Sequence, residues 1–197
     1  MIEPVSLAQM RRHLRLADDQ TDEDALIQSM ITAARRACEN KLNRSVVGTV
    51  RTATFTGFPS YPYYLTGRVP TREQLILSLP GGVITSVASI SYHDSDGIVQ
   101  TLDPAKFELD AAVLPAALAP VDVWPASYDR PDAVTITYVV SPLSQDDQEV
   151  VGQAIRLLVG NWYEHRESVA VDVRGVPTEM PMSVAWLLDP IRVIPFR

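Results

Sequence analysis

Six consecutive residues, Trp162 to Glu167, bring an indole, a phenol, two carboxylates, an imidazole and a guanidinium together in the sequence. Groups of these kinds carry out acid–base catalysis when they converge on one substrate. The apolar spacing before them predicts a helix, and each helical residue turns the chain by about 100°. Trp162, Glu164 and His165 would then point in different directions. The spacing therefore favours the end of a structural helix over a catalytic cluster.

A further interpretation of the same segment is a contact between subunits. Trp, Tyr and Arg are enriched in protein interfaces, so Trp162, Tyr163 and Arg166 are candidate subunit-contact residues. Glu164, Arg166 and Glu167 are expected in surface ion pairs, and the basic groups suit a helix C-terminus.

Metal and nucleotide motifs are missing from the sequence. His13, His93 and His165 are far apart and show no zinc-binding spacing. The run Asp94–Gly97 resembles the start of a calcium loop, but Ala105 occupies the position that needs a bidentate glutamate. A hairpin turn is the better interpretation. We therefore expect no metal, no cofactor, no catalytic residue and no enzymatic activity.

Cys38 is the single cysteine, so the chain has no internal disulfide, which fits a reducing cytoplasm. It lies on the apolar side of a predicted helix, which favours a buried structural thiol. No signal peptide or membrane span is expected, because no apolar run is long enough. The net charge of −7 argues against a general nucleic-acid binder.

The stretch Thr56–Arg68 contains three tyrosines, a phenylalanine and two prolines. Rigid aromatic side chains on such a loop suit contact with a partner. A long hairpin loop packed on its own sheet is equally favoured. Stacking on nucleic-acid bases is a third alternative, although only Arg68 and Arg72 supply positive charge nearby.

The elements that position these residues predict an α+β protein. Residues 1–45 read as a helix pair: the first begins at a Ser6 cap, and the second runs from about 22 to 43 after a Thr21–Asp24 capping box. Its inward face is predicted to carry Leu26, Met30, Ala33, Ala34, Ala37 and Leu42, widened by Ile27, Ile31 and Cys38.

Residues 46–143 alternate with period two and contain many turn residues, so they predict an inserted antiparallel β-domain of about five to seven strands. The dipeptide Asp96-Gly97 predicts a hairpin turn. Residues 144–180 read as a long helix, capped at Ser144 and ending near Arg166, followed by a loop. Residues 181–197 contain a short helix from about Pro181 and are predicted to form an extended C-terminal arm, too apolar for a solvated terminus.

The order of these parts resembles a known family. A helix pair "SLAQMRRHLRL…DEDALIQSMITAARRACENKLNRSV" precedes a β-insert ending "RPDAVTITYVVSP", and the helix "DDQEVVGQAIRLLVGNWYEHRESV" follows. The arrangement is similar to the head–tail connector (adaptor, or head-completion) proteins of long-tailed bacteriophages and gene transfer agents. The segment Asn161–Glu167 matches that family's typical helix end. The likeness covers most of the chain and is weakest over 56–72 and 98–130.

The resemblance implies a structural adaptor in a virion neck, assembled in the host cytoplasm. It implies a ring, commonly of twelve subunits, between the capsid portal and a tail-side neck protein, through which double-stranded DNA passes without sequence-specific binding. By the same analogy the C-terminal arm binds the portal through Trp186, Leu187, Leu188, Ile191, Arg192, Val193, Ile194, Phe196 and Arg197. Removing everything after Glu179 is then expected to leave a folded protein that no longer joins capsids to tails. The alternative is that the arm folds back on its own subunit.

Two alternatives stay open on the sequence alone. Another ring protein of the same particle, such as a tail terminator, would form a ring of six on the tail tube. An enzyme with an unrecognised site would lose turnover when Glu164 and His165 are replaced.

Overall fold

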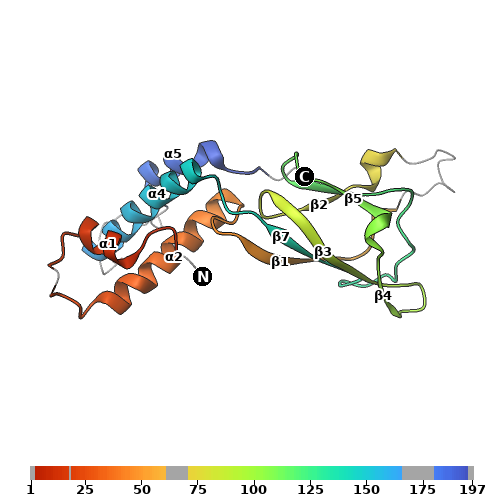
Figure 1. Cartoon of the computed structure of the whole chain (residues 1–197), viewed down its shortest axis with the longest axis horizontal. Helices are drawn as coiled ribbons and strands as arrows, with labels where there is room; N and C mark the ends of the chain where they lie inside the picture. Colours follow the sequence, from red (N-terminus) through yellow and green to blue (C-terminus); the bar gives the residue numbers. More distant parts are fainter. Residues whose placement is uncertain (1–2, 18, 61–70, 166–179, 195–197) are drawn as a thin grey trace, which may run out of the picture. The chain divides into compact units, whose positions relative to one another are not determined.

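The computed structural model describes residues 3–17, 19–60, 71–165 and 180–194 (Figure 1). It contains both helices and antiparallel sheets, so the predicted α+β class is confirmed. The chain divides into two compact units, Met1–Val47 with Leu143–Arg192, and Gly48–Pro142 with Val193–Arg197. Among the described residues, no helix is both long and apolar enough to cross a membrane.

The first unit begins with two helices, α1 (Leu7–His13) and α2 (Asp24–Leu42). The predicted Ser6 cap is confirmed, because Ser6 and Gln9 exchange hydrogen bonds between side chain and backbone in a complete capping box. The predicted capping box of Thr21 and Asp24 at the start of α2 is wrong. The residue before α2 is Glu23, which makes no capping hydrogen bond through its side chain. Asn43 ends α2 in the left-handed conformation, which asparagine tolerates well.

The inward face of α2 lies about one residue further along than predicted. Leu26 and Ala33 are exposed, whereas the buried stripe runs through Ile27, Ile31 and Cys38 and ends at Leu42. The directions of consecutive side chains around a helix differ by about 100°. An offset of one residue therefore turns a different edge of α2 toward the core. Residues predicted to widen the stripe therefore form its centre.

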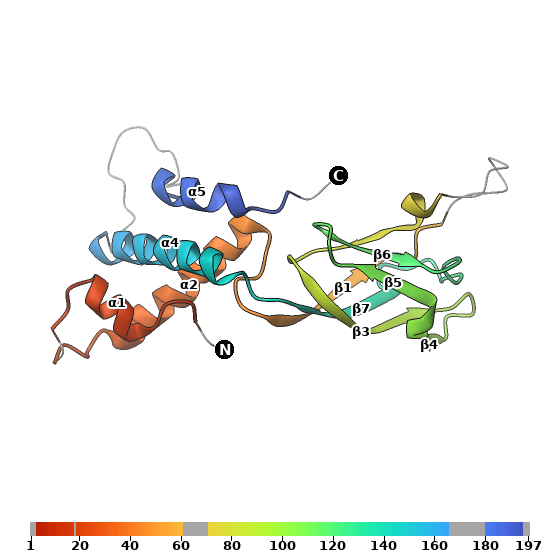
Figure 2. The same ribbon diagram turned by 45° about the horizontal axis from the view of Figure 1, so that its top comes forward.

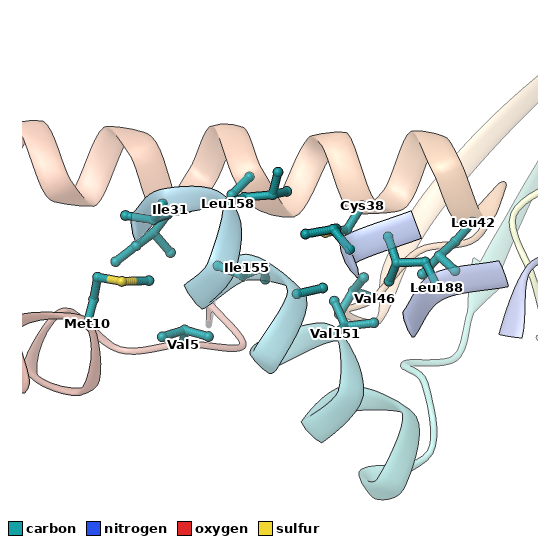
Figure 3. Packing of buried hydrophobic residues seen from close by; sticks show 14 of the residues in the cluster. Val5, Met10, Ile31, Cys38, Leu42, Val46, Val151, Ile155, Leu158 and Leu188 are labelled. Atoms are coloured by element: carbon teal, nitrogen blue, oxygen red, sulfur yellow. The ribbon is translucent and has the colours of Figure 1, made fainter. Parts of the chain in front are cut away.

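Two C-terminal helices complete the first unit, α4 (Gln145–Glu164) and α5 (Met182–Leu188), with a short 3-10 turn, Asp189–Ile191, after α5. Ser144 caps α4 as predicted, since its hydroxyl accepts a hydrogen bond from the backbone N–H of Asp147. Figure 3 shows α4 residues such as Val151, Ile155 and Leu158 packed against the α2 stripe. Leu188 of α5 belongs to the same buried cluster.

A buried ion network fixes the first segment of the chain to α2. The Arg35 side chain is 6% exposed, and it donates to Glu3 at 2.8 Å and to Glu39 at 2.7 Å. The second carboxylate oxygen of Glu39 accepts the backbone N–H of Val46 at 3.0 Å. One guanidinium thus links residues before, within and after α2. It is satisfied by two carboxylates, as a buried charge requires.

The second unit consists of two antiparallel sheets (Figure 2). The four-stranded sheet has the order β1-β7-β3-β4 and the three-stranded sheet the order β2-β6-β5. The strands are β1 (Thr49–Phe55), β2 (Leu77–Leu79), β3 (Ile84–His93), β4 (Val99–Thr101), β5 (Phe107–Asp110), β6 (Ala116–Pro120) and β7 (Val134–Val140).

The predicted turn at Asp96-Gly97 joins β3 to β4 and is confirmed. Gly97 has a φ of 78°, a conformation that glycine adopts without steric cost. Between the two sheets of this unit lies a buried cluster that includes Ile90, Leu118, Ile136 and Tyr138. Burial alternates strictly along β7, so one face of the four-stranded sheet packs on this core and the other faces outward.

Candidate interaction surfaces

Four groups of the predicted cluster, Trp162 to His165, belong to the described residues, and they differ in burial. Trp162 is half-buried and packs against the core of the first unit. Tyr163 is half-buried and donates a hydrogen bond to Glu23 at 2.5 Å. Glu164 and His165 are exposed, and His165 lies within 3.0 Å of the carbonyl of Asn161. Trp162, Tyr163 and His165 thus each have a local structural contact.

A role of this segment in subunit contact stays a prediction. The contacts of Trp162 and Tyr163 lie within their own unit. Arg166 and Glu167 fall outside the described residues.

The calcium-like run is a hairpin turn built around Asp94. One oxygen of its carboxylate accepts the backbone N–H groups of Asp96 and Ile98, and the other accepts the amide of Gln100 at 2.9 Å. The hydrogen bond from Gln100, followed by that from Ile98, holds the pKa of Asp94 below its ordinary value. Among the described residues, no group of three or more metal-ligating side chains could hold an ion.

Cys38 is a buried free thiol, as predicted. Burial, with a smaller contribution from the charge of Glu39, raises its pKa to about 12. The thiol is therefore protonated at neutral pH. A reactive cysteine needs a lowered pKa and solvent access, so this residue is not a nucleophile.

The first part of the aromatic stretch packs on its own unit. Phe58 is buried and stacks on Trp124, with ring centroids 4.7 Å apart and an interplanar angle of 11°. It also meets Tyr92 edge to face, at 5.5 Å. The indole N–H of Trp124 donates to the carbonyl of Leu75 at 2.6 Å. This supports the interpretation of a loop packed on its own sheet for Thr56–Ser60, while 61–70 lie outside the described residues.

A hollow of about 490 Å³ lies in the second unit. Its lining includes the carboxylates of Glu73, Glu108 and Asp110 and the small side chains of Ala117 and Ala119. Among the described residues, its lining includes no histidine, cysteine or serine.

The C-terminal residues divide into exposed and buried groups. Trp186 is 71% exposed on α5, and Met182, one turn earlier, is also exposed. Leu187 and Ile191 are half-buried, and Arg192 is exposed. Ile194 is 73% exposed. Phe196 and Arg197 fall outside the described residues.

Leu188 and Val193 are buried, so they are not available to a partner in this conformation. A chain cut after Glu179 would also lose Val184 and Leu188 from the core of the first unit. Such a truncation therefore removes more than a docking arm, contrary to the expectation that it leaves the fold intact.

Comparison with known proteins gives the family. The model of the phage gp6-like head-tail connector proteins matches residues 4–102, half of the chain. This chain is a member of that family. The match includes α1, α2 and β1 to β4, and so contains the helix pair that resembles the family. A search of curated proteins found no match to this connector.

Solved structures share the connector's fold over nearly its whole length. The neck of an empty GTA particle, computed with C6 symmetry, contains a chain with 20% identity and a TM-score of 0.68, covering 98% of this chain and 92% of that one. The virion of a native gene transfer agent (GTA) particle contains a chain with 20% identity and a TM-score of 0.65, with the same coverage. The neck of a native GTA particle, computed with C12 symmetry, gives 19% identity and a TM-score of 0.62, covering 97% and 90%.

Proposed function

We propose that this connector is a structural adaptor in the neck of a tailed phage or gene-transfer-agent particle, assembled in the host cytoplasm. Twelve copies form a ring between the portal and a tail-side neck protein and extend the channel for double-stranded DNA. The observation that carries the proposal is the family match over residues 4–102, joined to a neck-protein fold along 98% of the chain. The connector is not an enzyme in this proposal.

The surfaces of the described residues support a protein that acts by contact. Trp162, Tyr163 and His165 near the end of α4 have contacts within their own unit, and the thiol is buried and protonated. Exposed apolar side chains occur in both units, including Trp186 in the first and Val50 in the second. A ring requires two different patches on every subunit, because its contacts are head to tail.

The portal contact is assigned to the exposed C-terminal residues. Trp186 is the anchor of this contact, since a large exposed indole is the side chain most enriched at energetic centres of interfaces. Leu187, Ile191 and Arg192 lie beside it in sequence, and Ile194, Phe196 and Arg197 continue the contact. Leu188 and Val193 are left out of it because they are buried.

DNA passes the ring without being bound by sequence. The net charge of −7 disfavours adhesion to phosphate, since like charges repel. Attachment to DNA through a basic groove would require the opposite charge balance.

Particles made without the connector test the proposal directly. We expect filled or fillable heads and complete tails that stay separate in electron micrographs, and joined particles once the wild-type chain is supplied. Electron microscopy of the purified connector with its portal should show a twelve-fold ring on the portal. A six-fold ring bound to the tail tube alone would instead support the tail-terminator alternative, and normally joined particles would contradict an adaptor role.

A further inference from the structure

The outward face of the four-stranded sheet has an unusual composition. The pairing register aligns residues of β1, β7 and β3 in rows across the sheet, and alternate rows point away from the core. Three such rows define what we call the hydroxyl face: Val50–Val139–Ser86, Thr52–Thr137–Ser89 and Thr54–Thr135–Ser91. The three strands that carry it lie side by side in Figure 2.

The hydroxyl face contains no charged residue. Its side chains are threonines, serines and two valines, whereas charged residues make up 21% of the chain. Val50 is 63% exposed, although a valine gains free energy by leaving water. The central hydroxyls of Thr52 and Thr137 lie 3.5 Å apart, which confirms that their side chains share this face. Depletion of charged residues is typical of the centre of a protein interface, so the composition of this face is compatible with its being covered.

Strand β1 is the edge strand beside this face. In the order β1-β7-β3-β4, β1 pairs with β7 on one side and presents its other side as an edge. The unpaired N–H and C=O groups of a sheet edge can pair with another chain. The charged residue of β1, Arg51, alternates with the outward residues and does not lie on the hydroxyl face. The outward residues of β1 are Val50, Thr52 and Thr54, and the pairing of β1 with β7 is regular along its whole length.

We propose that the hydroxyl face is a contact between neighbouring copies of this chain in the ring, an inference that rests on the proposed ring. Each copy carries a net charge of −7, so two copies meet with least repulsion where neither presents a carboxylate at the contact. A basic partner would be attracted to carboxylates, which this face lacks. The neutral surface therefore selects a like-charged partner over a basic one.

The dimensions of the face suit the centre of such a contact. Strands about 4.8 Å apart with a rise of about 3.4 Å per residue give the three rows an area of about 300 Å². A standard interface buries about 800 Å² on each partner, with a charge-depleted centre and a polar rim. The hydroxyl face would be that centre, and β1 with its open edge lies on one border of it.

Charge placed on the face tests the inference. The variant carrying Thr52→Glu and Ser89→Glu puts two carboxylates in the middle row. Ser78→Glu, at the exposed position of β2 in the other sheet, is the control for added charge elsewhere. Mixed with portal, we expect the control to form rings as the wild type does. The double variant should form at least about tenfold fewer rings by native mass spectrometry, with an unchanged far-UV circular dichroism spectrum. Ring formation equal to the control would overturn the inference.

Photocrosslinking tests whether the hydroxyl face contacts a second copy, and it does not depend on the folding of the double variant. A photoreactive amino acid at Val50, in an otherwise wild-type chain, is activated in purified particles. A product of twice the chain mass supports the inference, whereas a product joined to a different protein, or no product at Val50, overturns it. If wild-type connector is found in the necks of particles, the proposed function holds whatever the crosslinking result. If the connector is absent from the necks, both the proposed function and the inferred contact are overturned.

Discussion

The phenol of Tyr163, in the last turn of α4, donates a hydrogen bond of 2.5 Å to the carboxylate of Glu23, which precedes α2. The bond joins residues 140 positions apart in the chain. Glu23 makes no capping hydrogen bond to its own helix, and its carboxylate is instead engaged by α4. Tyr163 thus has a structural role within the first unit.

Replacing Tyr163 by phenylalanine should therefore destabilise the first unit. The aromatic contacts of Phe58 with Trp124 and Tyr92 in the second unit should not change. The hydroxyl accounts for one partly buried hydrogen bond to a charged group, so we expect a loss of about 1 kcal/mol in the free energy of unfolding. Chemical denaturation measures it. Glu164→Gln, at the neighbouring exposed position, should change stability by less than about 0.5 kcal/mol. Equal effects of the two variants would contradict the assigned role of the bond.

The buried guanidinium of Arg35 predicts a larger loss. Arg35→Met fills similar volume but leaves the carboxylates of Glu3 and Glu39 without their counter-charge in a largely buried site. Removing one member of such a network costs on the order of 3 kcal/mol. Thermal unfolding of Arg35→Met should begin well below that of the wild type. Arg36→Met is the matched control, because Arg36 is exposed on the same helix, and it should unfold almost as the wild type does.

Much of the fold could be predicted because local signals were strong. The Ser6 and Ser144 caps and the Asp96-Gly97 turn depend on a few adjacent residues and are confirmed. The sequence features of strands β5 and β6 are weaker. β5 has four residues, and β6 is rich in alanine and ends at Pro120, which are weak features of a strand.

Tertiary packing decided the features that the sequence did not show. The inward edge of α2 depends on where α4 lies. Spacing alone therefore could not show that Ile27 is buried and Leu26 is exposed. The same holds for α5, where Trp186 and Leu188 are equally apolar in sequence but differ completely in burial. The uncharged rows of the four-stranded sheet required the register of β1, β7 and β3, which alternation within one strand does not give.

The raised pKa of Cys38 predicts both inertness and a pH dependence. Native connector should react with a thiol reagent at pH 8 only as it unfolds, since the thiol is buried and protonated. In the unfolded chain the thiol ionises near its ordinary pKa, whereas in the fold it ionises at about 12. The contribution to stability is thus complete below the unfolded pKa and is lost as pH rises toward 12. Its slope is about 1.4 kcal/mol per pH unit.

Denaturation curves between pH 8 and 11 measure this slope, and Cys38→Ala serves as the reference because it has no thiol. The wild type should lose stability over this range more steeply than Cys38→Ala. Parallel pH profiles, or fast labelling of the native protein, would contradict a buried protonated thiol.

Substitutions of Trp186 and Leu188 in α5 distinguish an effect on portal binding from an effect on stability. Leu188→Ala removes a fully buried side chain from the core of the first unit and should cost about 2–5 kcal/mol of stability. Trp186→Ala removes an exposed indole, so stability should change by less than about 0.5 kcal/mol. If Trp186 anchors the connector on the portal, however, this variant should lower the yield of joined particles at least tenfold at equal protein level. Met182→Ala, exposed on the same helix, is the control for loss of apolar surface alone and should reduce joining less. A Trp186→Ala connector that joins heads and tails as well as the wild type would place the portal contact elsewhere on the chain.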